Sequence, residues 1–85
     1  MYDVSAHASL SIVMPALDEG TRIVRVLAPL QPLRAHGCEI ILVDGGSVDD
    51  TLAQARPLVD HALVAPRGRA RQMNAGAAMA RGAPA

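Results

Sequence analysis

The sequence predicts an α/β fold, in which helices alternate with the strands of one parallel sheet to form three layers. The apolar runs at residues 10–14 and 40–43 have the composition of buried strands, the second covered on both faces, and residues 61–64 are expected to form a third, short strand. The segments between them place apolar residues at helical spacing, and every connection is too short for anything but a right-handed crossover. No repeat, linker or low-complexity segment divides the chain, so we expect one domain or part of one.

The first strand is expected to end at Pro15, because proline has no N–H group to continue a ladder. Residues 15–20 then form a loop. Asp18 is a candidate N-cap of the helix that follows, with Thr21 as the alternative. Asp18 and Glu19 also stand at the mouth of the sheet, where they either contact a ligand or only begin a helix.

Two prolines are expected to break the first helical segment. Pro29 and Pro32 interrupt its apolar pattern, and an interior proline costs a helix on the order of 3 kcal/mol. We therefore expect a helix over residues 21–28, a break, and a short helical turn after Pro32. Gly37 is expected to end this turn in a left-handed conformation.

Asp44 follows the second strand directly, at the carboxyl end where parallel sheets bind their ligands. Its carboxylate can accept hydrogen bonds from a nucleobase or a ribose, and Gly45 and Gly46 let a ligand approach the backbone. The alternative is a turn-forming aspartate that is bonded to the backbone of its own loop. The residues by themselves favour neither interpretation.

The second helix is expected to stop near Pro57 and to begin with a capping box formed by Ser47 and Asp50. Asp49 and Asp50 then complement the helix dipole, a role that we prefer to metal binding. A third helix is expected from Ala70 and packs closely on its neighbour. Its packing face is expected to comprise Met73, Gly76, Ala77 and Ala80.

The charge distribution is lopsided, although the net charge is zero. All eight acidic residues precede residue 66, and the remainder holds four Arg and no acid. Arg67, Arg69 and Arg71 alternate, and Arg71 shares a helical face with Asn74, an arrangement that suits a phosphate or diphosphate. The alternative is a solvated basic face.

Composition and motifs exclude several classes of protein. The single Cys38 cannot form an internal disulfide, and no segment approaches the roughly 20 apolar residues of a transmembrane helix. Residues 1–9 lack the basic and apolar regions of a signal peptide, so we expect a cytoplasmic protein. No dinucleotide-binding glycine motif and no Walker motif is present, and no nucleic-acid partner is expected.

Three segments together resemble the family 2 glycosyltransferases of the GT-A fold, in that family's order and over nearly the whole chain. They are Ser-Ile-Val-Met-Pro-Ala-Leu-Asp-Glu at residues 11–19, Val-Asp-Gly-Gly-Ser-Val-Asp-Asp-Thr at residues 43–51, and Gly-Arg-Ala-Arg-Gln-Met-Asn-Ala-Gly-Ala at residues 68–77. The third segment is similar to a branch with a Gly-Arg-Ala-x-Gln-Met-Asn-x-Gly signature. Family members often carry Asn at the position of Asp18.

The resemblance implies a site for a sugar-nucleotide donor, above all a UDP-sugar, whose sugar passes to an acceptor hydroxyl by displacement at the anomeric carbon. A base would deprotonate that hydroxyl. The implied binding residues are Pro15, Ala16, Glu19 and Asp44 with Gly45 beside it for the nucleoside, and Arg71 and Asn74 near the diphosphate.

The resemblance also implies Mg²⁺ or Mn²⁺, whose ligands would lie with the catalytic base beyond residue 85. We therefore expect residues 1–85 to form the nucleotide-binding half of a GT-A domain, with no metal ligand or catalytic residue of its own. The alternative is a non-catalytic nucleotide-binding or assembly module derived from this fold. The first strand would be an open edge, through which we expect the chain to pair with another copy, to misfold or to aggregate unless it belongs to a longer polypeptide.

Overall fold

The computed structural model describes residues 10–80, and the predictions for residues 1–9 and 81–85 lie outside this part. Its three parallel strands pair in the order β1 (Ser11–Ala16), β2 (Glu39–Asp44) and β3 (His61–Val64). Its α-helices are α1 (Arg22–Leu27), α2 (Gln31–Ala35), α3 (Thr51–Ala55) and α4 (Arg69–Met79).

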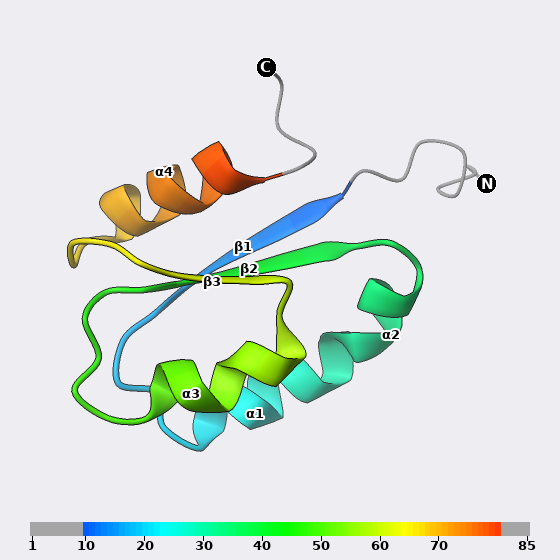
Figure 1. The fold of residues 1–85 in the computed structure, drawn as a ribbon, viewed down its shortest axis with the longest axis horizontal. Coiled ribbons are helices and arrows are strands. Elements are labelled where there is room, and N and C mark those ends of the chain that lie inside the picture. The colour runs from blue at the N-terminus through cyan, green and yellow to red at the C-terminus, as the bar shows by residue number, and fades with distance from the viewer. Residues whose placement is uncertain (1–9, 81–85) are drawn as a thin grey trace.

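The helices form the two outer layers of the molecule. Helix α4 covers one face of the sheet, whereas α1, α2 and α3 lie on the other face (Figure 1). This is the three-layer α/β arrangement that the apolar runs predict. None of the helices in residues 10–80 is long and apolar enough to cross a membrane.

Strand β2 is the centre of the core, since all six of its residues are buried. Its side chains alternate between the two faces of the sheet. Ile40 and Leu42 pack with the buried residues of α1 and α3. Ile41 and Val43 form a second cluster, against which Ala75 of α4 packs. Burial on both faces therefore explains why the run is apolar without interruption.

Strand β1 continues through Pro15 to Ala16, so the prediction that it ends at Pro15 is wrong. Ala16 O accepts a hydrogen bond from Gly45 N (2.9 Å), and Leu10 O accepts one from Glu39 N (2.9 Å). Because backbone groups alternate in direction along a strand, those of Pro15 face away from β2. Strand β1 is at the edge of the described sheet, so the missing N–H group of Pro15 breaks no bond of the ladder.

The first helical segment breaks at Pro29 as expected, whereas Pro32 lies within the first turn of α2 rather than before it. A 3₁₀ turn over Ala28–Leu30 separates α1 from α2, which runs over Gln31–Ala35. Gly37 follows α2 with a φ of 95°, a conformation that glycine adopts without strain. Helix α3 stops before Pro57, as was expected for the helix after the second strand, and passes into a 3₁₀ turn over Arg56–Leu58.

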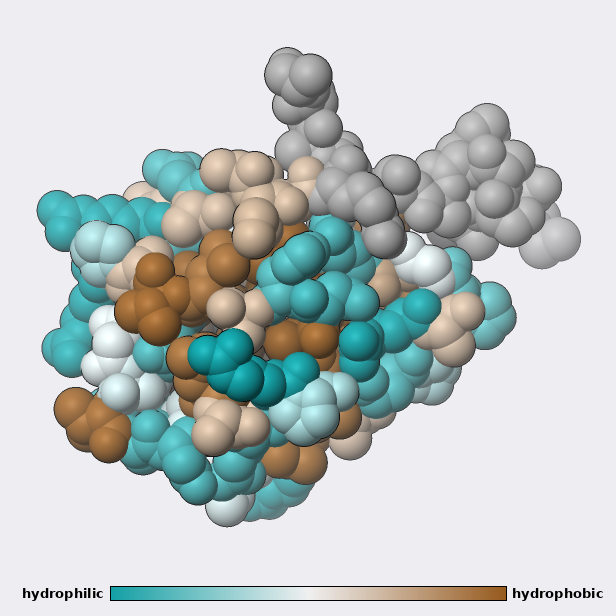
Figure 2. Space-filling view, in the orientation of Figure 1, coloured by the Kyte–Doolittle hydropathy of each residue, from teal (hydrophilic) through white to brown (hydrophobic). Residues whose placement is uncertain are grey.

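Helix α4 begins at Arg69, one residue earlier than expected, and its packing face differs in part from the prediction. Gln72 and Gly76 are buried, whereas Ala77 is exposed. The face is rotated because the polar side chain of Gln72 points into the protein. In the space-filling view, weakly hydrophobic residues cover the region of α4 and hydrophilic ones project at the left, where α4 begins (Figure 2).

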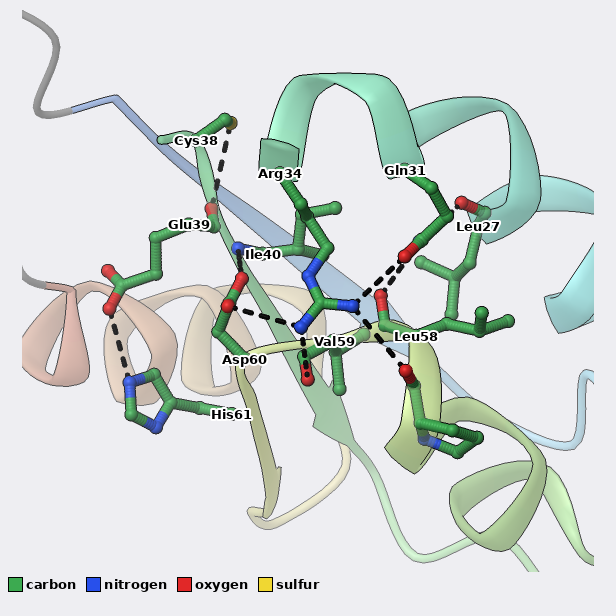
Figure 3. Close-up of polar contacts among 11 residues, drawn as sticks. Leu27, Gln31, Arg34, Cys38, Glu39, Ile40, Leu58, Val59, Asp60 and His61 are labelled. Carbon is green, nitrogen blue, oxygen red and sulfur yellow. Dashed lines mark hydrogen bonds and ion pairs between the residues drawn. The ribbon is translucent and has the colours of Figure 1, made fainter. Parts of the chain in front are cut away.

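Polar side chains link α2 to the backbone near the start of β2 and β3 (Figure 3). Arg34 of α2 donates to Val59 O (3.4 Å), to Asp60 Oδ1 (3.3 Å) and to Gln31 Oε1 (2.9 Å). These contacts hold α2 against the segment that leads into β3.

Glu39 joins the first residues of all three strands. It is 3 % exposed, and its Oε1 accepts a hydrogen bond from the Ser11 hydroxyl (2.9 Å). Its Oε2 lies 3.1 Å from Nε2 of His61. The buried carboxylate therefore has partners on both neighbouring strands.

Candidate functional site

The candidate site lies at the carboxyl ends of the strands, because three loops leave the parallel sheet at that one edge. They are residues 17–21 after β1, residues 45–50 after β2, and residues 65–68 after β3. The sequence-predicted residues Pro15, Ala16, Glu19, Asp44 and Gly45 belong to the first two of these strand ends. The beginning of α4 brings the basic segment to the same edge.

Asp44 is only 3 % exposed and is bonded within its own loop. Its Oδ2 accepts hydrogen bonds from Gly46 N (3.0 Å) and Ser47 N (2.7 Å), and its Oδ1 accepts one from the Ser47 hydroxyl. These are the contacts of the turn-forming aspartate, one of the two interpretations that the residues left open. A carboxylate has about four acceptor positions, and these three bonds occupy three of them.

The loops after β1 and β2 are bonded to each other. Asp18 N donates to the Ser47 hydroxyl (2.8 Å), and Asp18 Oδ1 accepts from Val48 N (2.8 Å). Gly20 N donates to the hydroxyl of Thr51 (3.0 Å). Asp18 adopts a φ of 48° and does not cap α1; the alternative, Thr21, occupies the N-cap position, without a side-chain cap bond. Its carboxylate is used instead by a loop 30 residues away in the sequence.

The prediction of a capping box at the start of α3 is wrong. Ser47 is bonded to Asp44, and Asp50, the N-cap residue, makes no side-chain cap bond. Asp49 Oδ1 instead accepts from Thr51 N (3.0 Å) and from the Thr51 hydroxyl. The hydrogen bond from this hydroxyl is the main reason that the pKa of Asp49 lies below its ordinary value of 3.8.

Gln72 is the site residue that sequence reasoning missed. Its side chain reaches from α4 to the ends of β1 and β2, where Nε2 donates to Ala16 O (3.1 Å) and Val43 O (2.9 Å). Its Oε1 accepts from Gly68 N (3.2 Å). Its place within residues 68–77, the third segment that resembles the family, could have indicated a role, but only Arg71 and Asn74 of that segment were assigned one.

A shallow pocket of about 180 Å³ opens beside these residues. Its lining residues are Pro15, Ala16, Leu17, Glu19, Arg69 and Gln72. Three of the predicted residues thus line one depression together with Arg69. Asp44 and Gly45 are buried next to it, since Gly45 N is bonded to Ala16 O. Arg71 and Asn74 are exposed on α4 and do not line the pocket.

The pocket carries charges of both signs. Glu19 is an acidic wall residue, and its carboxylate also forms an ion pair with Arg22 (3.2 Å). Arg69 is exposed at the first position of α4. Because the first backbone N–H groups of a helix have no partner within it, this end of α4 presents donors as well as a guanidinium. The arrangement suits an anionic group near Arg69.

The described residues do not fit the divalent metal that the family resemblance implies. Within residues 10–80, no group of three or more His, Cys, Asp or Glu side chains is arranged to hold a metal ion. The carboxylate of Asp18 accepts a hydrogen bond from a backbone N–H of the loop after β2, and that of Asp49 accepts hydrogen bonds from Thr51.

Comparison with protein families matches residues 11–83 to the family described as Glycosyl transferase family 2. Comparisons with curated proteins and with solved structures found no match. The matched range includes the parallel sheet and the four α-helices described within residues 10–80, and every residue of the pocket. The chain therefore belongs to glycosyl transferase family 2.

Proposed function

We propose that this chain binds the nucleotide of a sugar-nucleotide donor at the carboxyl ends of β1 and β2, as the nucleotide-binding part of a GT-A glycosyltransferase domain. The observation that carries the proposal is the convergence of Pro15, Ala16 and Glu19 with Arg69 in one pocket. The carboxyl ends of parallel strands, where the chain leaves the sheet, are where α/β sheets bind ligands.

The nucleoside is assigned to the side of the pocket formed by the ends of β1 and β2. Pro15 and Leu17 line the pocket and are half-buried, which offers an apolar surface for a base. Asp44 and Glu19 supply carboxylate acceptors for an N–H group of the base or for ribose hydroxyls. Uracil has one such N–H group, so a UDP-sugar is the donor that we propose.

The diphosphate is assigned to the beginning of α4. Arg69 lines the pocket, so we add it to Arg71 and Asn74 as a phosphate contact. A guanidinium binds phosphate oxygens through two parallel donors, and the start of the helix adds backbone N–H groups. The Gly68 to Gly76 segment also supports assignment to the branch with the Gly-Arg-Ala-x-Gln-Met-Asn-x-Gly signature, since its Gln72 and Gly76 are the buried residues of α4.

The test is a calorimetric titration of the chain with UDP. Asp44→Ala is expected to weaken UDP binding by at least about tenfold, since a hydrogen bond to a charged group contributes about 1.5–3 kcal/mol. Asp50→Ala controls for the loss of a negative charge, because Asp50 is an exposed carboxylate that accepts a hydrogen bond from Gln54 on α3. A folded wild-type chain that binds no UDP at millimolar concentration would contradict the proposal.

Arginine variants locate the diphosphate within the site. Arg69→Ala is expected to weaken binding of UDP more than binding of uridine, because only UDP carries the phosphates that the guanidinium would contact. Arg56→Ala removes an exposed guanidinium from the 3₁₀ turn before β3, at the other end of the sheet, and should leave UDP binding unchanged. Equal effects of the two substitutions would mean that only the net charge matters.

A further inference from the structure

We propose that Gln72 is a positioning residue of the donor site, which holds the carboxyl ends of β1 and β2 against the first turn of α4. The inference rests on the proposed function, because it concerns the geometry of the same pocket. Nothing in the family match assigns this role to Gln72.

Both donors of the Gln72 amide are committed to the backbone. One N–H of Nε2 reaches Ala16 O (3.1 Å) and the other reaches Val43 O (2.9 Å), while Oε1 accepts from Gly68 N (3.2 Å). The orientation of the amide follows from these partners, because a flipped amide would place Oε1 against two carbonyl oxygens. With 5 % of its surface exposed, Gln72 acts on the pocket through the backbone that it holds.

Gly45 provides the space that Gln72 occupies. A Cβ atom at Gly45 would lie 2.9 Å from Oε1, 3.0 Å from Cδ and 3.1 Å from Nε2 of Gln72. Gly45 does not have a positive φ, so its backbone does not require glycine, whereas Gly46 has a φ of 97° and open space around it. Side-chain packing therefore explains the first glycine of the pair, and backbone conformation explains the second.

The carbonyl oxygen of Ala16 connects the ends of β1 and β2 to Gln72. Ala16 O accepts from Gly45 N (2.9 Å) as well as from Gln72. Ala16 lines the pocket, and Gly45 follows the proposed nucleoside contact Asp44. Arg69, the proposed phosphate contact, lies one helical turn before Gln72 on α4. A displacement of Gln72 would therefore change the relative positions of the groups that bind base and phosphate.

Gln31 offers a matched control at the opposite end of the sheet (Figure 3). Its Nε2 also donates to two carbonyls, Leu27 O and Leu58 O (2.9 Å each), and its Oε1 also accepts one hydrogen bond, from Arg34. Gln31→Met and Gln72→Met thus remove the same number of hydrogen bonds, two donated to carbonyls and one accepted, although the one that Gln31 accepts comes from a guanidinium. Only the second substitution touches the pocket.

The experiment compares UDP affinity in the two variants, each well below its melting temperature. Gln72→Met is expected to weaken UDP binding about tenfold, because two donors are lost. Gln31→Met is expected to lower the melting temperature without changing the affinity by more than about twofold. Equal affinities of Gln72→Met and the wild type would overturn the inference, as would equal losses in both variants.

Gln72→Glu adds a pH profile, which a general loss of packing would not alter. It keeps the length of the side chain and the acceptor for Gly68 N, but its ionised form cannot donate to the two carbonyls. Its UDP affinity, relative to that of the wild type at the same pH, should rise as protonation restores one donor between about pH 7 and pH 5. A ratio that is independent of pH would contradict the positioning role.

Amide hydrogen exchange tests the inference without UDP. Exchange at Gly45 N, which is bonded to Ala16 O, should accelerate in Gln72→Met relative to Gln31→Met by about tenfold after correction for global stability. Failure of the wild type to bind UDP would refute the proposed function, while this comparison still decides on Gln72. Equal exchange at Gly45 N in the two variants would refute the role of Gln72.

Discussion

Gly76 is the position at which the contact between helix α4 and the sheet can be tested most directly. Gly76 is buried, and a Cβ atom there would lie 2.2 Å from Cγ1 of Val13 and 3.0 Å from Cγ2 of Val43. Carbon atoms without a bond between them make favourable contacts at about 3.5–4.0 Å. The Gly76→Ala substitution therefore forces α4 away from β1 or forces the stiff side chain of Val13 out of its rotamer.

Two opposing effects determine the change in the free energy of unfolding. Overpacking costs about 1–3 kcal/mol and more where the backbone must move, whereas replacing glycine by alanine within a helix contributes about 1 kcal/mol of stability. With a separation as short as 2.2 Å, the upper part of the overpacking range applies. We expect a net destabilisation of about 1–2 kcal/mol, which lowers the melting temperature of a domain of this size by roughly 4–16 °C.

The assay is thermal unfolding followed by circular dichroism, with two further variants. Ala77→Gly, at an exposed position of the same helix, measures the helix-propensity effect alone. Adding Val13→Ala to Gly76→Ala should recover part of the loss, because it removes the Cγ1 atom that the new methyl group meets. A melting temperature of Gly76→Ala equal to or above that of the wild type would refute the close packing of α4 on β1.

Three further predictions concern stability and association. The hydrogen bond from Thr51 lowers the folded-state pKa of Asp49, so the stability that this carboxylate contributes is present above its ordinary pKa and is lost as the pH falls through the folded-state pKa. Asp49→Asn should therefore flatten the decline in melting temperature below about pH 4, and parallel curves of melting temperature against pH for the variant and the wild type would contradict this. Arg34→Met should lower the free energy of unfolding in urea by about 1–3 kcal/mol. Arg34→Lys should also be destabilised, since one ammonium cannot replace donors that reach Gln31, Val59 and Asp60 at once, and full stability of the Lys variant would disprove this explanation. Strand β1 pairs on one side only within residues 10–80, so we expect light scattering after size exclusion to detect dimers or larger species at micromolar concentration, and a sharp monomer peak with cooperative melting would rule this out.

Much of the fold was predictable from the sequence because the determining features act locally. The apolar run before Asp44 identified the buried central strand, and Pro29 identified the break in the first helical segment. Gly37 adopts the left-handed conformation that was expected after this segment. Each of these features depends on the conformational limits of a few consecutive residues, so a pattern of neighbours is sufficient to predict it.

The errors fall where a polar side chain or a proline depends on a distant partner. Asp18 was expected to cap α1, but its carboxylate accepts a hydrogen bond from the loop after β2. Ser47 was expected to cap α3, but it is bonded to Asp44. Pro15 was expected to end β1, and only the strand order shows that its nitrogen faces an edge. In each case the partner lies elsewhere in the fold, or the environment is set by a neighbouring strand.

The candidate site divides in the same way. Its place at the carboxyl end of the sheet, and the presence there of Pro15, Ala16, Glu19 and Asp44, followed from the order of strands and loops. Binding of a donor by these residues stays a prediction. The three-dimensional structure added Arg69 to the pocket and brought Gln72 to the carbonyl groups of β1 and β2.

The sequence by itself therefore determined the three-layer α/β fold, the buried central strand and the location of the candidate site at the carboxyl ends of the strands. Only the tertiary structure decided how Gly45 and Gln72 are used. In sequence, Gly45 resembles any turn glycine, and Gln72 resembles a polar residue on the surface of a helix. Their roles arise because the fold brings two carbonyls from different strands within hydrogen-bonding distance of one buried amide, and a Cβ atom at Gly45 would occupy the same space.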